Sequence, residues 1–409
     1  MTQKILLATT VKWPSAAYLA GAFAALGCSV EAVFPRGHAL GVSRHVGRAH
    51  TYYPLRPHSS FAAAIAAAKP DLIVPCDDRA VSHLLSIEAQ APEVTVLLVR
   101  SMGRLESYPA MMARSRAIAV AQAEGISAPL TVAVANEGEF WRALKSVGLP
   151  AVLKADGSWG GDGVAVVRTH EEASRAFRKL AGPPSRLRSL SRAVLRKDAH
   201  FLQEALVPKT APVQVQRFIR GKPATSAFAC RDGEGLAAIH MDVVQSRGAT
   251  GPAMLIERTD CNKMDEAARR IARRFGLSGL HGLDFVRDDD GVPHLIEINP
   301  RATQICHLAL GAGHDLPSAL LSRPPRLTAT DSPLIALFPQ AWSTGRLSPD
   351  ALAAYHDVPW DDPEVVSAAI GSGFTLLMRQ PRQKKPAAGL QFLTDGLKES
   401  GARRRRLQL

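Results

Sequence analysis

The sequence predicts a mixed fold, with a parallel-sheet α/β domain at the N-terminus followed by an α+β region. Two observations support this prediction. Over residues 1–109, short apolar runs alternate with helical patterns, which is typical of strand–helix–strand units in a parallel sheet. Near residue 300, the run HLIEINPRATQ instead carries polar residues at every second position, which is the period of a strand with two different faces.

The elements of the first domain follow in order along residues 1–109. The predicted strands are KILLATT, CSVEAVFP, DLIVPCDD and VTVLLVR, and the predicted helices are SAAYLAGAFAALG and FAAAIAAAKP. No GxGxxG motif stands in the first turn, so the dinucleotide fingerprint is absent. Asp77 and Asp78 directly follow a strand, where open α/β sheets bind ligands, although a helix N-cap at this turn explains them equally well.

The pattern changes from about residue 110. The segment RSRAIAVAQAEGISAP predicts a helix stopped by Gly125, and PVQVQRFIRGKPATSAFACR predicts two strands joined by a turn at Gly221. MDEAARRIARRFGLSG has the spacing of an amphipathic helix that ends at a glycine. The last ninety residues are Pro-rich, with WDDPEVVSAAI as one predicted helix and a basic tail that we expect to be disordered.

The composition fits a globular protein of two or three domains. The chain has 409 residues, of which 46% are hydrophobic, and no run approaches the roughly 18 apolar residues that a membrane span needs. Its five cysteines are scattered without a CxxC pair, which favours a reducing cytoplasm and argues against a zinc site.

The net charge of +13 is unevenly distributed. From Arg379 to the end there are nine Lys or Arg and two acids, and the stretch 184–197 adds five more cations. Neither segment is interleaved with aromatic residues, as single-strand nucleic-acid binders usually are. We therefore expect a solvated surface and a mobile tail without a specific nucleic-acid partner. An anionic surface as a partner of the tail and an oligomeric assembly both stay open.

A hairpin is predicted around the polar run near residue 300. Asp290-Gly291 strongly favours a two-residue turn. Counting outward from this turn places Asp284 opposite Glu297, and Asn299 opposite Gly282, where no side chain obstructs it.

This pairing predicts a metal site. Opposed residues have Cβ atoms about 4.5 to 5.5 Å apart, and like charges at that distance repel. The carboxylates of Asp284 and Glu297, together with the amide oxygen of Asn299, are the kind of ligands that Mg²⁺ takes alongside substrate phosphates. The alternative is an amphipathic hairpin whose polar face only meets water.

A glycine-rich loop lies upstream, in AVLKADGSWGGDGVAVV. An apolar β-rich run follows its glycines, so a strand–loop–strand cover is predicted instead of a P-loop. Gly157, Gly160, Gly161 and Gly163 would let backbone N–H groups approach phosphate oxygens, and Lys154 supplies a positive charge beside them. A purely structural Gly-rich hairpin is the other interpretation.

The loop and the hairpin occur in this order about 130 residues apart. That combination resembles the ATP-grasp superfamily of carboxylate–amine ligases, over roughly residues 110–320. The resemblance implies a Rossmann-like N-terminal domain followed by a two-lobed ATP-grasp fold. It also implies a lid lobe at about residues 127–215 and an accessory C-terminal segment at residues 321–409.

The resemblance also assigns roles to residues. It implies ATP and Mg²⁺ as cofactors, with Mn²⁺ as a possible substitute, and metal ligation by Asp284, Glu297 and Asn299. Arg301 corresponds to the arginine beside the transferred phosphate, and Lys154 to a phosphate-binding lysine of the lid. We expect these two cations to be the catalytic residues.

Nucleotide binding is where the sequence departs from the family pattern. Arg114 stands where the family usually has a phosphate-binding lysine, and an arginine keeps the charge. The segment VQVQRFIRG is similar to the interlobe segment that contacts adenine, here Gln216, Phe218 and Ile219. Family members often carry glutamates where this chain has Gln216 and Arg217, and Pro223 stands near the place of a ribose-binding acid.

The implied reaction has two steps. ATP phosphorylates a small carboxylate, and an amine then attacks the acyl phosphate to form an amide or peptide-type bond. The segment 243–253 is a candidate substrate loop through Arg247, although an ordinary exposed arginine is the other interpretation. Two other classes stay open: a nucleotide-binding sensor or scaffold without ligase activity, and a kinase- or carboxylase-like relative that forms an acyl phosphate.

Overall fold

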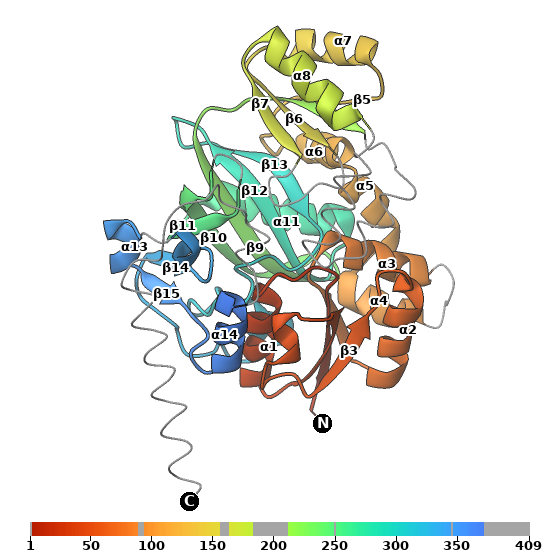
Figure 1. The fold of residues 1–409 in the computed structure, drawn as a ribbon, viewed down its shortest axis with the longest axis vertical. Coiled ribbons are helices and arrows are strands. Elements are labelled where there is room, and N and C mark those ends of the chain that lie inside the picture. Colours follow the sequence, from red (N-terminus) through yellow and green to blue (C-terminus); the bar gives the residue numbers. More distant parts are fainter. Residues whose placement is uncertain are drawn as a thin grey trace, which may run out of the picture.

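Three sheets organise the chain in the computed structural model, which describes residues 2–88, 94–155, 163–182, 212–248, 251–344 and 347–371. Figure 1 shows the N-terminal sheet at the bottom, the large central sheet in the middle and a small sheet at the top. The basic stretch 184–197 and the tail from residue 379 lie outside the described residues. Within the described segments, no helix combines the length and apolar character that crossing a bilayer requires.

The N-terminal sheet is parallel, as predicted, with the strand order β3-β2-β1-β4. Its strands are β1 (Lys4–Ala8), β2 (Ser29–Pro35), β3 (Arg48–Tyr52) and β4 (Leu72–Pro75). Its helices are α1 (Ser15–Ala25), α2 (Pro57–Ala68), α3 (Asp78–Glu88) and α4 (Thr95–Met102). The mixed α/β fold expected for the whole chain is confirmed, with this parallel sheet standing before mixed and antiparallel sheets.

One predicted strand of this domain is wrong. VTVLLVR forms α4, which lies beside the edge strand β4. Leu98, Ser101 and Met102 are buried at helical spacing, and the backbone N–H of Ile73 in β4 donates to Ser101 Oγ at 2.9 Å. A short apolar run with β-branched residues does not distinguish a strand from a buried helix, and here the tertiary contact decides the outcome.

The central sheet has seven strands in the order β13-β12-β9-β10-β11-β14-β15. They are β9 (Lys222–Arg231), β10 (Glu234–Ser246), β11 (Ala253–Arg258), β12 (Gly279–Arg287), β13 (Pro293–Asn299), β14 (Leu334–Leu337) and β15 (Tyr355–Asp357). The predicted amphipathic helix is α11 (Asn262–Phe275), which ends at Gly276 in the left-handed conformation. The predicted C-terminal helix is α14 (Pro363–Gly371).

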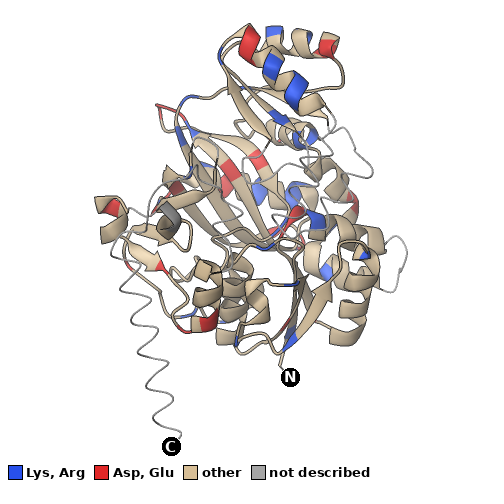
Figure 2. Ribbon diagram, viewed as in Figure 1, with Lys and Arg blue, Asp and Glu red and all other residues tan. Residues whose placement is uncertain are grey.

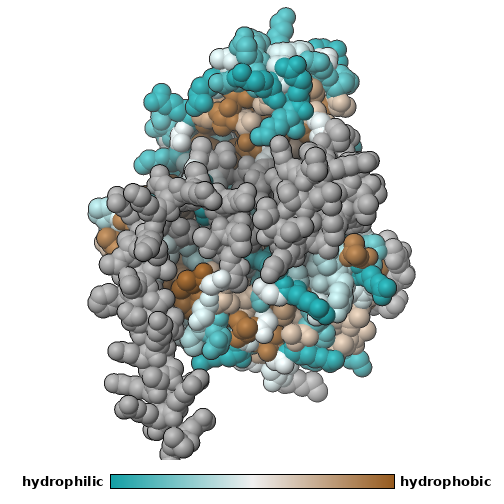
Figure 3. All heavy atoms as spheres, viewed as in Figure 1, coloured by the Kyte–Doolittle hydropathy of each residue, from teal (hydrophilic) through white to brown (hydrophobic). Residues whose placement is uncertain are grey.

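The small sheet at the top is antiparallel and is covered by two helices. Its order is β5-β8-β6-β7, with β5 (Thr131–Val134), β8 (Val213–Arg217), β6 (Ala151–Ala155) and β7 (Val164–Val167). The helices are α7 (Glu137–Val147) and α8 (His170–Ala181), whose Phe140 and Phe177 rings stack at 4.3 Å. Their outer face is mostly hydrophilic (Figure 3). We call this unit the lid.

The pairing of β6 with β7 confirms the strand–loop–strand prediction. Residues 156–162 between them, including Gly157, Gly160 and Gly161, lie outside the described residues. The two strands predicted on either side of Gly221 are also present. They belong to different sheets, β8 to the lid and β9 to the central sheet, so the turn connects two layers.

Gly103, at the end of α4, lies against the segment that follows α11. A Cβ there would stand 2.1 Å from the carbonyl oxygen of Gly276, which cannot move without shifting backbone. Gly148, at the end of α7, has a positive φ of 82°, similar to the 86° of Gly103. A Cβ added at Gly148, however, would meet no atom within 4 Å. We expect Gly103→Ala to be less stable than Gly148→Ala by about 2 kcal/mol, because only the first adds a clash to the backbone strain. Urea unfolding of both variants measures this difference, and equal midpoints would contradict it.

Candidate active site

The predicted register of the polar hairpin is confirmed. Strands β12 and β13 pair antiparallel with Asp284 opposite Glu297 and Gly282 opposite Asn299. A Cβ on Gly282 would lie 2.4 Å from Cγ2 of Thr303, so the glycine makes room for the loop that follows β13. The two carboxylates therefore come from neighbouring positions on adjacent strands.

The predicted two-residue turn, however, is wrong. The N–H of Asp288 donates to the carbonyl of Val292 at 3.0 Å, and the N–H of Gly291 donates to the carbonyl of Asp288 at 2.9 Å. These bonds enclose a three-residue loop with Gly291 at φ 78°, a common hairpin form. Compared with the predicted two-residue turn, the extra loop residue shifts the strand register by one, so that Phe285 pairs with Leu295. A bulge at Ile296 then restores the predicted register, and Asp284 pairs with Glu297.

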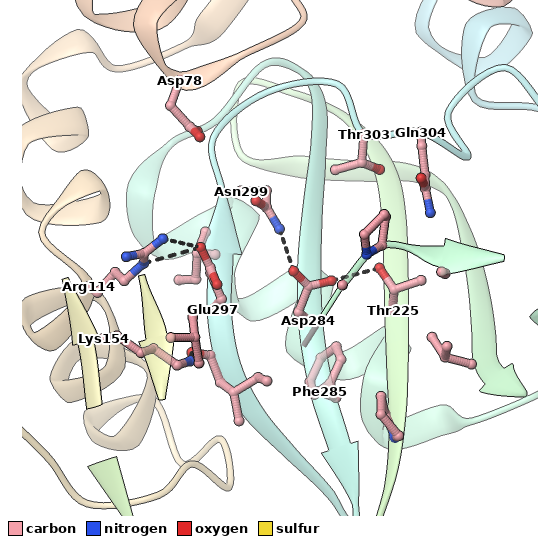
Figure 4. A pocket seen from close by; sticks show the side chains of 18 of the residues that line it. Asp78, Arg114, Lys154, Thr225, Asp284, Phe285, Glu297, Asn299, Thr303 and Gln304 are labelled. Carbon is pink, nitrogen blue, oxygen red and sulfur yellow. Dashed lines mark hydrogen bonds and ion pairs between the residues drawn. The ribbon is translucent and has the colours of Figure 1, made fainter. Parts of the chain in front are cut away.

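A chain of hydrogen bonds crosses the polar face of the hairpin (Figure 4). Asp284 accepts from Asn299 Nδ2 at 2.9 Å and from Thr225 Oγ1 at 2.9 Å. Asn299 Oδ1 in turn accepts from Arg301 Nη2 at 3.1 Å. Thr225 lies on β9, beside β12, and sequence reasoning missed it because no local signal reveals which strand is the neighbour of β12.

Glu297 is held by a cation from another element. Arg114, the first residue of α6 (Arg114–Ala123), donates from Nε and Nη2 to Glu297 Oε1 at 3.2 and 2.9 Å. Its Nη1 donates to the carbonyl of Ala155 in β6 at 2.7 Å, so one guanidinium links the hairpin to the lid. Lys154 is only 5% exposed and donates from Nζ to the carbonyl of Ile296 at 3.2 Å, at the bulge.

The two facing carboxylates have opposite electrostatic surroundings. Burial, and then the charge of Glu297, raise the pKa of Asp284 above its ordinary value. Burial acts in the same direction on Glu297, but Arg114 and Lys154 outweigh it and hold the pKa of Glu297 below its ordinary value. Burial lowers the pKa of Lys154, although Glu297 opposes this shift.

These residues fit a divalent cation. In the described part of the chain, no Lys, Arg or His forms an ion pair with Asp284, and the charge of Arg301 offsets its burial only in part, so positive charge is still missing there. A cation held by Asp284 and Glu297 would supply that charge, and carboxylates are the ligands that Mg²⁺ prefers. Asn299 presents its amide nitrogen to Asp284, and half a turn of the amide would present its oxygen instead.

The two aspartates after β4 have separate tasks. Asp77 is 7% exposed and accepts from the N–H of Ala80 at 2.9 Å and from Thr10 Oγ1 at 2.7 Å, so it is the helix cap that the alternative interpretation described. Asp78 accepts from Arg301 Nε at 3.1 Å. The N-terminal domain therefore contacts the site directly, through a charged pair that the sequence did not reveal.

The acidic and basic side chains described above all line one cavity of about 850 Å³. It lies between the lid, the central sheet and the N-terminal domain, where acidic and basic segments meet (Figure 2). Its lining includes the candidate phosphate and metal residues and the candidate adenine contacts: Arg114, Lys154, Gln216, Phe218, Ile219, Asp284, Glu297, Asn299 and Arg301. Gly163 directly precedes β7, and Arg247 is not among the described residues that line the cavity.

Comparison with known proteins identifies a domain around this cavity. A family model described as "ATP-grasp domain" matches residues 141–304, a range that includes the polar hairpin and the lid except for β5 and the start of α7. This part of the chain is similar to an ATP-grasp domain.

The individual proteins that the chain resembles are distant in sequence. A match to the carbamoyl phosphate synthase large chain of Methanothrix thermoacetophila is 24% identical over an alignment of 221 residues and covers 51% of this chain but only 19% of that protein. A structure of N5-carboxyaminoimidazole synthase from Aspergillus clavatus, with ADP and 5-aminoimidazole ribonucleotide, has a TM-score of 0.59 at 14% identity, covering 81% of both chains. An L-amino acid ligase from Bacillus licheniformis has a TM-score of 0.55 at 14% identity, covering 78% of this chain and 75% of that one.

Proposed function

We propose that this chain is an ATP- and Mg²⁺-dependent ligase that joins a small carboxylate to an amine through an acyl phosphate. The observation behind the proposal is the meeting of two carboxylates and three cations, Arg114, Lys154 and Arg301, in one cavity. The coarser statement, an ATP-grasp enzyme of the ligase and carboxylase kind, is supported by relatives that include a carbamoyl phosphate synthase and an amino acid ligase.

The residues of the chain would act mainly by placing charge. Arg114, Lys154 and Arg301 offer positive charge to the phosphates of ATP from three different elements, which stabilises the transferring group. Asp284, Glu297 and Asn299 would hold Mg²⁺, or Mn²⁺ in its place. Either ion would supply further charge neutralisation at the phosphates. The lid, placed over the cavity by β6 and β8, would keep water away from the acyl phosphate.

The adenine would occupy the end of the cavity formed by Gln216, Phe218 and Ile219. Gln216 is 3% exposed, and its amide nitrogen donates to Thr131 Oγ1 at 2.9 Å, so its side chain is fixed within the lid sheet. The backbone near Phe218 and Ile219 is therefore the better candidate for base recognition. Pro223 lines the same end without a polar side chain for the ribose.

The carboxylate and amine substrates would enter from the N-terminal domain. The cavity extends past Arg301 to Trp13, Asp78 and Gln304, which lie at the carboxyl ends of parallel strands or in the loop after β13. Open α/β sheets bind ligands at that edge. We propose Arg247, next to Ser246 in the cavity lining, as a residue of the substrate loop.

We also propose a reducing cytoplasm as the setting of this protein, because its five cysteines are free.

The test is the dependence of phosphate release on two substrates. We expect ADP and phosphate to accumulate when ATP and Mg²⁺ are present together with a carboxylate and an amine from an amino acid panel. Accumulation should be much slower when the carboxylate or the amine is left out. Release with the carboxylate alone would favour a kinase- or carboxylase-like enzyme. Nucleotide binding without release across the panel would favour a sensor.

A further inference from the structure

A continuous chain of polar contacts runs from the N-terminal domain to the metal face of the hairpin. Asp78 Oδ1 accepts from Arg301 Nε at 3.1 Å, and Arg301 Nη2 donates to Asn299 Oδ1 at 3.1 Å. Asn299 Nδ2 donates to Asp284 Oδ2 at 2.9 Å. One of the contacts between the two domains is thus an acid–arginine pair that leads to the site.

Asp78 stands on a rigid support. It lies in the first turn of α3, whose start is capped by Asp77. The next turns of α3 are anchored by Ala80, Val81 and Leu84, all 0% exposed in the core of the N-terminal domain. Because the backbone of Asp78 is held in place by this helix, its carboxylate can fix the position of the Arg301 guanidinium.

Arg301 is oriented by its contacts but keeps donors to spare. A guanidinium has five N–H donors in a planar fork. Three of them are engaged in the described structure: Nε with Asp78, Nη2 with Asn299 and Nη1 with the carbonyl of Ala302 at 3.3 Å. One N–H remains on each terminal nitrogen. Arg301 lines the cavity, so these two donors are available to phosphate oxygens there.

We propose that Asp78 is a positioning residue for phosphate recognition, which holds Arg301 by its Nε so that both terminal nitrogens face the γ-phosphate. This inference rests on the proposed function. It adds a residue of the N-terminal domain, outside the segment 141–304 that matches the family model, to the machinery of the site. The opposite charges of Asp78 and Arg301, which form an ion pair at 3.1 Å, favour the same geometry.

Two opposing effects must be separated in the test. Removing Asp78 deletes an anion near the phosphates, which alone would strengthen their binding. It also frees Arg301 to rotate, which would weaken binding to the γ-phosphate only. Asp78→Asn removes the charge but keeps an oxygen acceptor for Nε, whereas Asp78→Ala removes both.

The experiment compares two nucleotides by calorimetry on the full chain with Mg²⁺: ADP, and AMP-PNP, a non-hydrolysable ATP analogue with a γ-phosphate. For Asp78→Ala we expect the ratio of AMP-PNP to ADP affinity to fall about tenfold, the effect of losing one charged hydrogen bond. Asp78→Asn is expected to keep the ratio within about twofold. Ser86→Ala, on the same helix but away from the cavity, is the matched control and should not change it. Because the ratio is measured within each variant, partial unfolding cancels.

Arg301→Ala completes the cycle. It should lower the ratio at least as much as Asp78→Ala, and the double variant should fall no further than Arg301→Ala, since positioning by Asp78 acts only through Arg301. If Arg301→Ala lowers the ratio but Asp78→Ala leaves it unchanged or raises it, the positioning role is wrong while the proposed function stands. If neither nucleotide binds the wild-type chain, or Arg301→Ala has no effect, both the role of Arg301 and the positioning by Asp78 are overturned.

Discussion

Glu297→Gln is expected to reduce ATP-dependent turnover by about 10²- to 10³-fold. This is the effect typical of removing one group that provides electrostatic stabilisation in an active site. The change keeps the shape of the side chain and removes the charge that faces Asp284 across the hairpin. It weakens the proposed metal site. It also leaves Arg114 without the anion that it contacts at 2.9 Å in the free protein.

Steady-state phosphate release with saturating ATP measures this effect. Glu257→Gln, which changes an exposed acid on β11 of the same sheet, is the control and should keep wild-type turnover. Circular dichroism and a thermal melt would establish that Glu297→Gln is folded. Wild-type turnover in a folded Glu297→Gln variant would remove Glu297 from the metal site.

Lys154→Met is expected to weaken ATP binding about 30- to 100-fold, because a buried cation that meets phosphate makes one of the stronger charge-assisted contacts. Methionine keeps most of the apolar stem, so the lid core around β6 should stay packed. Lys154 is nearly fully buried beside Glu297, so its removal takes away one of the three cations that hold the pKa of Glu297 low.

Calorimetric titration of ATP into the variant measures the loss. Lys145→Met, on the exposed side of α7 in the same lid, is the matched control. It has the same substitution without a cavity contact, so its ATP affinity should equal that of the wild type. An unchanged affinity in Lys154→Met would mean that this lysine only packs against the bulge at Ile296.

Local patterns predicted much of the site. The alternation through residues 294–301 placed the polar side chains on a strand, and the turn signal near Gly291 placed its partner strand. The pairing of Asp284 with Glu297 was correct although the turn was not, because the extra loop residue and the bulge at Ile296 compensate. The bulge is a tertiary feature, tied to Lys154 from the lid, so the sequence carries no local signal for it.

Contacts between distant segments could not be predicted. Thr225 reaches Asp284 only because β9 lies beside β12, and Asp78 reaches Arg301 across 223 residues of sequence. The segment that forms α4 was predicted as a strand because a contact between distant segments is again decisive. Packing against β4, and not the composition of the segment, makes it a helix.

The central sheet has consequences for biosynthesis. Its last two strands, β14 and β15, come from the C-terminal part of the chain, and the residues just before α14 return to the first domain, where Ser43 Oγ donates to Asp362 at 2.6 Å. A nascent or truncated chain that stops before β14 would leave the edge of β11 unpaired, a surface that invites aggregation. The ribosome must therefore release nearly the whole polypeptide before the central sheet can be completed, and a fragment that ends before β14 is expected to express poorly.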